Sequence, residues 1–123
     1  MLAHLGEHPR AMLESGRGAI LTRHLAEGLE RFASAFAPRP VVYRFSDFKT
    51  NEYRNLRGGE RYEPSEENPM IGYRGCARYL AEPDLFALEV EALKEARRHF
   101  SNLWIMLPFV RTISELKGTI SLL

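Results

Sequence analysis

Two short apolar runs, each preceded by an amphipathic segment, constrain the fold of this 123-residue chain more than any other feature. The first run is "VVYRF" at 41–45, and the second is "LWIMLPF", which begins at Leu103. Runs of β-branched and aromatic residues next to prolines are typical of strands. The first run reads without polar alternation, so we expect it to be a strand that is buried on both faces.

Apolar residues recur every three or four positions before each run, which predicts a helix over 19–36 and a second one from Asp84 to His99. A third helix is expected after Thr112, which forms a capping box with Glu115. The predicted buried positions of the first helix are Leu21, Leu25, Leu29, Phe32 and Phe36. Those of the second are Leu85, Phe86, Leu88, Val90, Ala92 and Leu93.

Residues 46–69 are rich in charge and contain a Gly58-Gly59 pair, which predicts a long loop with a turn. We interpret "EPSEEN" within it as a solvated charge run, because its spacing fits no metal loop. "MIGYR" at 70–74 is expected to be a short strand, and "GCARYLAEP" after it a turn. The resulting alternation of helices and strands indicates an α/β fold with parallel strands. A closed eight-stranded barrel needs about 250 residues, so this chain has too few strands for one, and we expect it to be part of something larger.

The charge balance excludes a strong global field, because 17 Lys and Arg stand against 16 Asp and Glu. Binding to nucleic acid or to an anionic membrane is therefore not expected, and any anion site has to be local. The single cysteine, Cys76, excludes an internal disulfide and fits a reducing, cytoplasmic compartment. We expect it to be a small buried residue, although a reactive thiol is the alternative. No stretch approaches the length of a membrane span.

Other polar residues form no recognisable catalytic pattern. The four histidines do not cluster and are expected at the surface or at helix ends; they are His4, His8, His24 and His99. Asp47 and Glu52 could pair with Lys49 or Arg54, and we expect structural roles for them.

Three arginines follow the predicted strands: Arg44 closes the first, Arg74 closes "MIGYR", and Arg111 lies just past the last. Ligands of parallel α/β folds bind at the carboxyl ends of strands, where the loops converge. Guanidinium groups bind carboxylate and phosphate in a bidentate way, so three of them predict a site for a small, multiply charged anion. The other interpretation is that each arginine is an ordinary solvated or ion-paired surface residue.

Three strings carry a resemblance to a known family: "VVYRFSDFKTNEYRNLRGGERYEPSEENPMIGYRGCARY", "FALEVEALKEAR" and "IMLPFVRT". Together they resemble the phosphoenolpyruvate synthases (pyruvate, water dikinases) from about Pro38 to Thr112. The resemblance implies that 1–123 is a truncated (β/α)8 TIM barrel, the first half of the C-terminal phosphoenolpyruvate/pyruvate-binding domain. A helical lead-in would occupy about 1–37.

Enzymes of that family convert ATP, pyruvate and water to phosphoenolpyruvate, AMP and phosphate, with Mg2+ as cofactor. The resemblance implies that Arg44, Arg74 and Arg111 bind pyruvate and phosphoenolpyruvate. The family's metal ligands, catalytic cysteine, phosphohistidine domain and ATP-binding domain lie outside the matched strings, and Cys76 does not correspond to that cysteine. We therefore expect the chain to be catalytically incomplete, to act with those two domains, and to form a homo-oligomer through open strand edges.

Two alternatives remain open. The chain could be a non-catalytic α/β domain that binds an anion or a partner protein through the same surface. It could also belong to a related dikinase or phosphotransferase that uses phosphoenolpyruvate, although those families lack the "SDFKTNEY" and "GGERYEP" strings.

Overall fold

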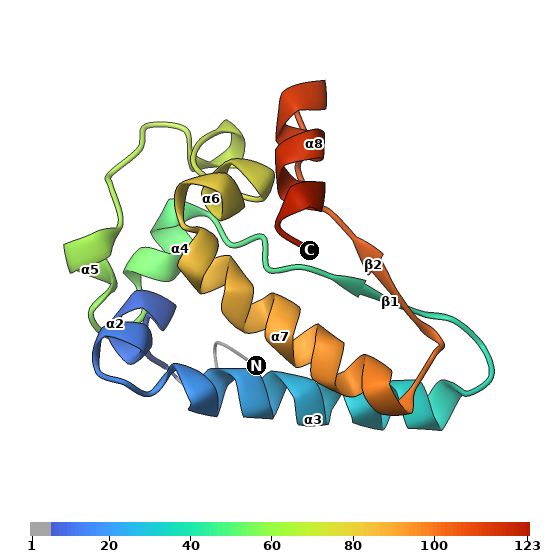
Figure 1. Cartoon of the computed structure of the whole chain (residues 1–123). Helices are drawn as coiled ribbons and strands as arrows, with labels where there is room; N and C mark the ends of the chain where they lie inside the picture. The colour runs from blue at the N-terminus through green and yellow to red at the C-terminus, as the bar shows by residue number, and fades with distance from the viewer. Residues whose placement is uncertain (1–5) are drawn as a thin grey trace.

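Two parallel strands and two long helices form the centre of the computed structural model, which describes residues 6–123. Strands β1 (Val41–Arg44) and β2 (Leu103–Met106) pair in register from Val41 with Leu103 to Arg44 with Met106. The connection between them includes α7 (Pro83–His99), which lies along α3 (Gly18–Phe36) on one side of the sheet (Figure 1). A helical crossover between parallel strands confirms the predicted α/β class.

The main core lies between α3, α7 and the face of the sheet that they cover. Both helices form where the apolar period predicted them, which confirms these two elements. Two predicted buried positions of α3 were wrong, since Phe32 and Phe36 are 62% and 43% exposed, and Leu85 and Leu88 of α7 are only half-buried. Phe45 just after β1 and Leu103 in β2 are completely buried, and the ring of Phe86 on α7 lies 4.9 Å from that of Phe45. The buried helix positions are Leu21, Leu25, Ala26, Leu29 and Ala33 on α3, and Phe86, Val90, Ala92, Leu93 and Ala96 on α7.

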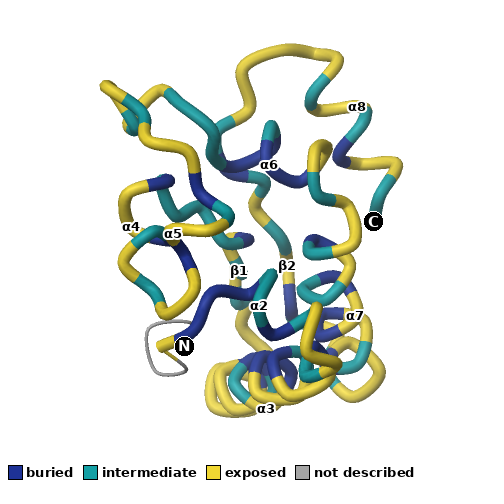
Figure 2. Tube along the Cα trace, turned by 90° about the vertical axis from the view of Figure 1, so that its left-hand side faces the viewer, coloured by how far each residue is buried: buried dark blue, intermediate teal, exposed yellow. Residues whose placement is uncertain are grey.

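The prediction that the first strand is buried on both faces was wrong. Val42 of β1 is 54% exposed, and its neighbours Trp104 and Met106 on β2 are 61% and 48% exposed. Successive side chains of a strand point to opposite faces, and the described residues cover only the face that meets α3 and α7. Exposed positions alternate with half-buried ones along β1 and with buried or half-buried ones along β2 (Figure 2). The uncovered face of the sheet is therefore apolar.

The predicted long loop contains short helices instead. They are α4 (Thr50–Arg54) and α5 (Gly59–Tyr62), followed by a 3₁₀ turn, η1 (Pro69–Ile71). The Gly58-Gly59 turn is confirmed, because Gly58 has a φ of 83°, a conformation that glycine adopts without strain. A Cβ at Gly59 would lie 2.1 Å from the carbonyl oxygen of Tyr53, so only glycine fits there.

"MIGYR" is not a strand. Its backbone turns through η1, and the amide of Tyr73 donates to the carboxylate of Glu66 at 3.0 Å instead of to a neighbouring strand. The residues predicted to form a turn after it are helical, as α6 (Cys76–Ala81). The carboxylate of Glu66 therefore takes the place of a neighbouring strand as the hydrogen-bond partner of this backbone. Strand periodicity in the sequence does not reveal such a contact.

The ends of the described chain are also helical. Helix α2 (Pro9–Glu14) begins after His8, whose Nδ1 accepts a hydrogen bond from the amide of Arg10 at 3.1 Å. Helix α8 (Ile113–Ser121) confirms the third predicted helix. Only half of its capping box forms, since Thr112 accepts from the amide of Glu115 whereas the Glu115 carboxylate accepts from the amide of Arg111.

None of the described helices combines the length and the apolar character that a membrane crossing needs. His4 falls outside the described residues. The proposed lead-in over about 1–37 stays a prediction.

Candidate functional site

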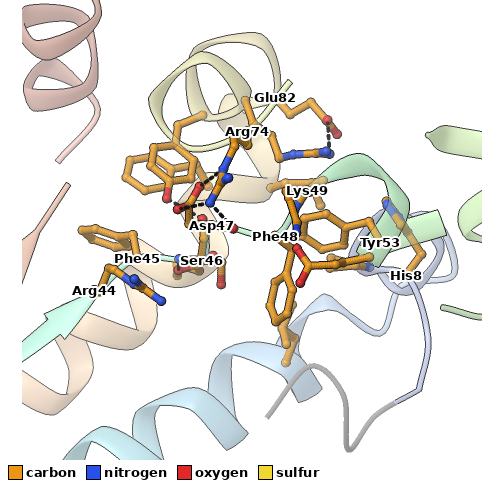
Figure 3. A pocket seen from close by; sticks show the side chains of 18 of the residues that line it. His8, Arg44, Phe45, Ser46, Asp47, Phe48, Lys49, Tyr53, Arg74 and Glu82 are labelled. Carbon is orange, nitrogen blue, oxygen red and sulfur yellow. Dashed lines mark hydrogen bonds and ion pairs between the residues drawn. The ribbon is translucent and has the colours of Figure 1, made fainter. Parts of the chain in front are cut away.

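A cavity of about 480 Å³ opens at the carboxyl end of β1 and contains the candidate anion site. Arg44 and Arg74 both line it, and we call it the arginine cavity (Figure 3). Its polar lining also includes Lys49 and Glu89, while its apolar wall comes from α3 and α7. The apolar residues of that wall are Leu21, Leu25, Leu85 and Phe86.

Arg44 is an exposed side chain at the last position of β1. It makes no hydrogen bond or ion pair with any residue of 6–123. Its guanidinium is therefore available to an anion.

Arg74 lies in the loop before α6, and its side chain is held by Asp47, which also lines the cavity. Its Nε and Nη2 donate to the two carboxylate oxygens of Asp47 at 2.9 and 2.8 Å, and its Nη1 donates to the carbonyl of Met70 at 3.1 Å. The Asp47 hydrogen bonds raise the pKa of Arg74, so the guanidinium stays charged. The expected pairing of Asp47 with Lys49 or Arg54 was wrong, since its partner is 27 positions away.

Gly75 fixes the loop of Arg74 against the end of β2. Its φ is 56°, and a Cβ there would lie 2.6 Å from the carbonyl oxygen of Pro108 and 2.7 Å from Cβ of Phe109. The amide of Cys76 donates to the same Pro108 carbonyl at 3.3 Å. Because only glycine fits this close approach, Arg74 is placed by the backbone as well as by its ion pair.

Arg111 lies beside Arg74 without lining the arginine cavity. Its guanidinium stacks on the ring of Phe109 with its carbon 4.8 Å from the ring centre, and Arg74 contacts the same ring at 4.5 Å. Arg111 also donates to the carbonyl of Gly72 and lies 3.5 Å from Glu115. The structure thus places two of the three arginines in the cavity and the third next to it, across Phe109.

Glu89 is a functional-site candidate that the sequence interpretation missed. Its carboxylate accepts from the Tyr43 hydroxyl at 2.8 Å and from the Ser46 amide at 3.0 Å. Burial raises the pKa of Glu89, and these neutral donors offset that effect only in part. The available signal was its position three residues after Phe86 and four after Leu85, on the apolar face of the helix.

A second group of charges is buried, and we call it the buried charge network: His8, Glu63 and Arg78. His8 and Arg78 also line the arginine cavity, whereas Glu63 does not. Nε2 of His8 lies 2.8 Å from the Glu63 carboxylate, which also accepts two hydrogen bonds of 2.7 Å from Arg78. Two tyrosine rings stack on the Arg78 guanidinium, with Tyr73 at 4.3 Å and Tyr53 at 4.6 Å. Burial alone would raise the pKa of Glu63, but hydrogen bonds from His8 and Arg78 hold this pKa below its usual range.

This network corrects two expectations. His8 does sit at a helix end, as predicted, but it is buried with only 1% exposure. "EPSEEN" is not simply a solvated run, because Glu63 is buried and Glu66 accepts from the Thr50 hydroxyl at 2.7 Å. Cys76 is buried as expected, and burial raises the pKa of its thiol, which makes it a poor nucleophile at neutral pH.

Within residues 6–123, no group of three or more His, Cys, Asp and Glu side chains is arranged to hold a metal ion. The described residues therefore do not fit a Mg2+ site, and no chemistry of this chain is assigned to the metal.

The family model for the PEP-binding domain of PEP-utilising enzymes matches residues 9–123. The chain is 51% identical over 121 residues to the probable phosphoenolpyruvate synthase of Staphylothermus marinus, and 52% identical over 125 residues to the phosphoenolpyruvate synthase of Aeropyrum pernix. It is 44% identical over 140 residues to the Escherichia coli phosphoenolpyruvate synthase. These alignments cover 94%, 97% and 94% of the chain, but only 14%, 15% and 18% of those relatives.

Proposed function

Because the chain belongs to the PEP-utilising enzymes through their PEP-binding domain, we propose that it supplies arginine anchors for pyruvate and phosphoenolpyruvate in a phosphoenolpyruvate synthase. The anchors are Arg44, Arg74 and Arg111. The parallel α/β segment would then be part of a TIM barrel whose strand ends form the substrate site.

One observation supports this proposal above the others: Arg44 and Arg74 line the same cavity at the end of β1. Phosphoenolpyruvate carries a carboxylate and a phosphoryl group, and planar guanidinium groups bind both kinds of anion in a bidentate way. Arg111 adds a third positive charge at the edge of this cavity, through the ring of Phe109 that it shares with Arg74.

In the proposed reaction, ATP, pyruvate and water give phosphoenolpyruvate, AMP and phosphate. The role of this chain's arginines is to fix the pyruvate carboxylate and to stabilise the negative charge on the phosphoryl group during transfer. The ATP-binding and phosphohistidine domains, and the ligands of Mg2+, would come from the rest of a full-length enzyme. We therefore propose that the chain does not turn over by itself, and that the enzyme acts in the cytoplasm.

The test is a calorimetric titration of the chain with phosphoenolpyruvate and with pyruvate. Arg44→Ala should abolish measurable binding, since Arg44 is the exposed anchor at the strand end, whereas the melting temperature should stay close to that of the wild type. Arg97→Ala is the matched control, because Arg97 is an exposed arginine on α7 that does not line the arginine cavity. Equal affinity for all three proteins would remove Arg44 from the site.

A second candidate function is favoured by the uncovered face of the sheet, where Val42, Trp104 and Met106 form an apolar surface. Contiguous exposed apolar surface is typical of sites that bind another protein chain. We propose as this second function a non-catalytic domain that binds a partner protein, or a second copy of the chain, through this face. In size-exclusion chromatography the chain would then elute as a complex whose size is the same for the wild type and for Arg44→Ala.

A further inference from the structure

We propose that Asp47 is a built-in competitor for the anion site, whose carboxylate an incoming ligand displaces from Arg74. The inference rests on the proposed function and deepens it, since it names the residue that sets the affinity for phosphoenolpyruvate. Asp47 contacts the binding arginine and not the reacting atoms, so it adjusts the affinity for the anion and does not take part in the reaction.

The geometry of the pair leaves little of Arg74 for a ligand. The Nε and Nη2 atoms form the edge on which a carboxylate docks, and both donate to Asp47, at 2.9 and 2.8 Å. The remaining Nη1 donates to the Met70 carbonyl at 3.1 Å. Figure 3 shows the Asp47 carboxylate in front of the guanidinium, in the position that a bidentate ligand would take. A ligand carboxylate or phosphoryl group can reach this edge only when Asp47 leaves it.

Only the side chain of Asp47 has to move for this exchange. The backbone on both sides is tied down, because the Ser46 amide donates to Glu89 at 3.0 Å and the Lys49 amide donates to Glu52 at 2.8 Å. The hydroxyl of Tyr79 also donates to the carbonyl of Ser46. A rotation about the Asp47 side-chain bonds is therefore sufficient, without rearrangement of the segment between β1 and α4.

Arg74 keeps its position when Asp47 leaves. The Phe109 ring lies 4.5 Å from its guanidinium carbon, the Met70 carbonyl holds Nη1, and the backbone after it is fixed by the close contact at Gly75. The two side chains are 13% and 8% exposed, so their attraction is less screened than that of a surface ion pair. The cost of separating them is therefore subtracted from the ligand's binding free energy.

Calorimetry with phosphoenolpyruvate on the 123-residue chain tests the proposal. Asp47→Asn keeps the shape of the side chain but removes its charge, and it should bind phosphoenolpyruvate about tenfold more tightly. The gain should vanish in the Arg74→Ala background, because the competition acts through Arg74. Glu52→Gln is the matched control: it removes a charge that lines the same cavity, yet Glu52 does not bond to Arg74, and the change should stay within about twofold.

An unchanged or weaker affinity of a folded Asp47→Asn variant, with clear binding by the wild type, would overturn this inference and leave the proposed function standing. Absence of binding in both proteins would overturn the two together. If the Asp47→Asn variant does not fold, an NMR measurement on the wild type still tests the inference. The Nε–H resonance of Arg74, assigned with Arg74→Lys, should shift on saturation with phosphoenolpyruvate as Asp47 is replaced, and an unmoved resonance would count against displacement.

Discussion

Two regions of the molecule withdraw a glutamate from water, Glu63 fully and Glu89 in part, and the surroundings move the two pKa values in opposite directions. In the buried charge network, the carboxylate of Glu63 meets His8 and Arg78, and its pKa is lowered. At the arginine cavity, the hydrogen-bond donors to Glu89 are the Tyr43 hydroxyl and Ser46, all of them neutral, and its pKa is raised. Burial is common to both, so the hydrogen-bonded cation decides the direction.

The same contrast separates the two buried arginine–carboxylate pairs. Arg78 also lines the arginine cavity, but two tyrosine rings stack on it, and its carboxylate partner Glu63 is 1% exposed and does not line the cavity. Arg74 and Asp47 both line the cavity, so a ligand that enters it can reach both partners. A pair whose carboxylate is enclosed by protein holds segments of the chain together, whereas a pair with both partners in a cavity wall can be exchanged for a ligand.

The largest effect is expected from Glu63→Gln, which breaks the enclosed pair. It leaves the Arg78 charge buried without its counter-ion, so we expect a loss of about 3 kcal/mol in the free energy of unfolding. Urea denaturation followed by circular dichroism measures it. Asp47→Asn serves as the comparison and should lose much less, because the cavity admits water to Arg74. Equal losses would mean that the two pairs do not differ in kind.

A smaller effect of opposite sign is expected from Glu89→Gln. The amide keeps an acceptor for the Tyr43 hydroxyl but removes a partly buried charge that has no hydrogen-bonded cation, so the variant should be about 1 kcal/mol more stable at neutral pH. Thermal and urea melts at pH 7 measure the gain. A clear destabilisation would show that the ionised form of Glu89 is favoured by its surroundings after all.

The smallest effect is a difference in pH dependence between the two variants. The pKa of Glu63 is lowered in the folded state, so its contribution to stability is present above the ordinary glutamate value of 4.5 and is lost as pH falls through the folded pKa. The pKa of Glu89 is raised, so its folded form holds the proton longer and the wild type loses stability as pH rises from 4.5 through the folded pKa.

Urea melts between pH 3 and pH 8 would compare the two slopes. The penalty of Glu63→Gln should shrink toward acid, and the gain of Glu89→Gln should shrink toward acid as well, because protonation makes each wild-type side chain neutral like its replacement. A gain of Glu89→Gln that does not depend on pH would assign it to packing instead of charge.

The long elements of this fold could be predicted from the sequence, because α3 and α7 repeat their apolar period over many turns. The short elements could not. Helix α4 depends on Glu52 capping Lys49, and the bend that replaces the "MIGYR" strand depends on Glu66 accepting from the amide of Tyr73. Single contacts of this kind leave no periodic trace, so tertiary structure decided these segments.

The candidate site shows the same division. The spacing placed Arg44, Arg74 and Arg111 after predicted strands, and two of the three do line one cavity. Arg74 reaches it from a loop and not from a strand end. Its pairing with Asp47 could not be predicted, because it joins positions 27 apart and follows from the way Gly75 packs on Pro108.

The uncovered face of the sheet also provides a spectroscopic reporter. Trp104 is the only tryptophan in the sequence and is 61% exposed on that face. An indole in contact with water emits at longer wavelength than one surrounded by protein. Any chain that packs on the sheet, whether a second copy or the remainder of a barrel, would shift the emission of this single residue to the blue, so assembly can be followed without a label.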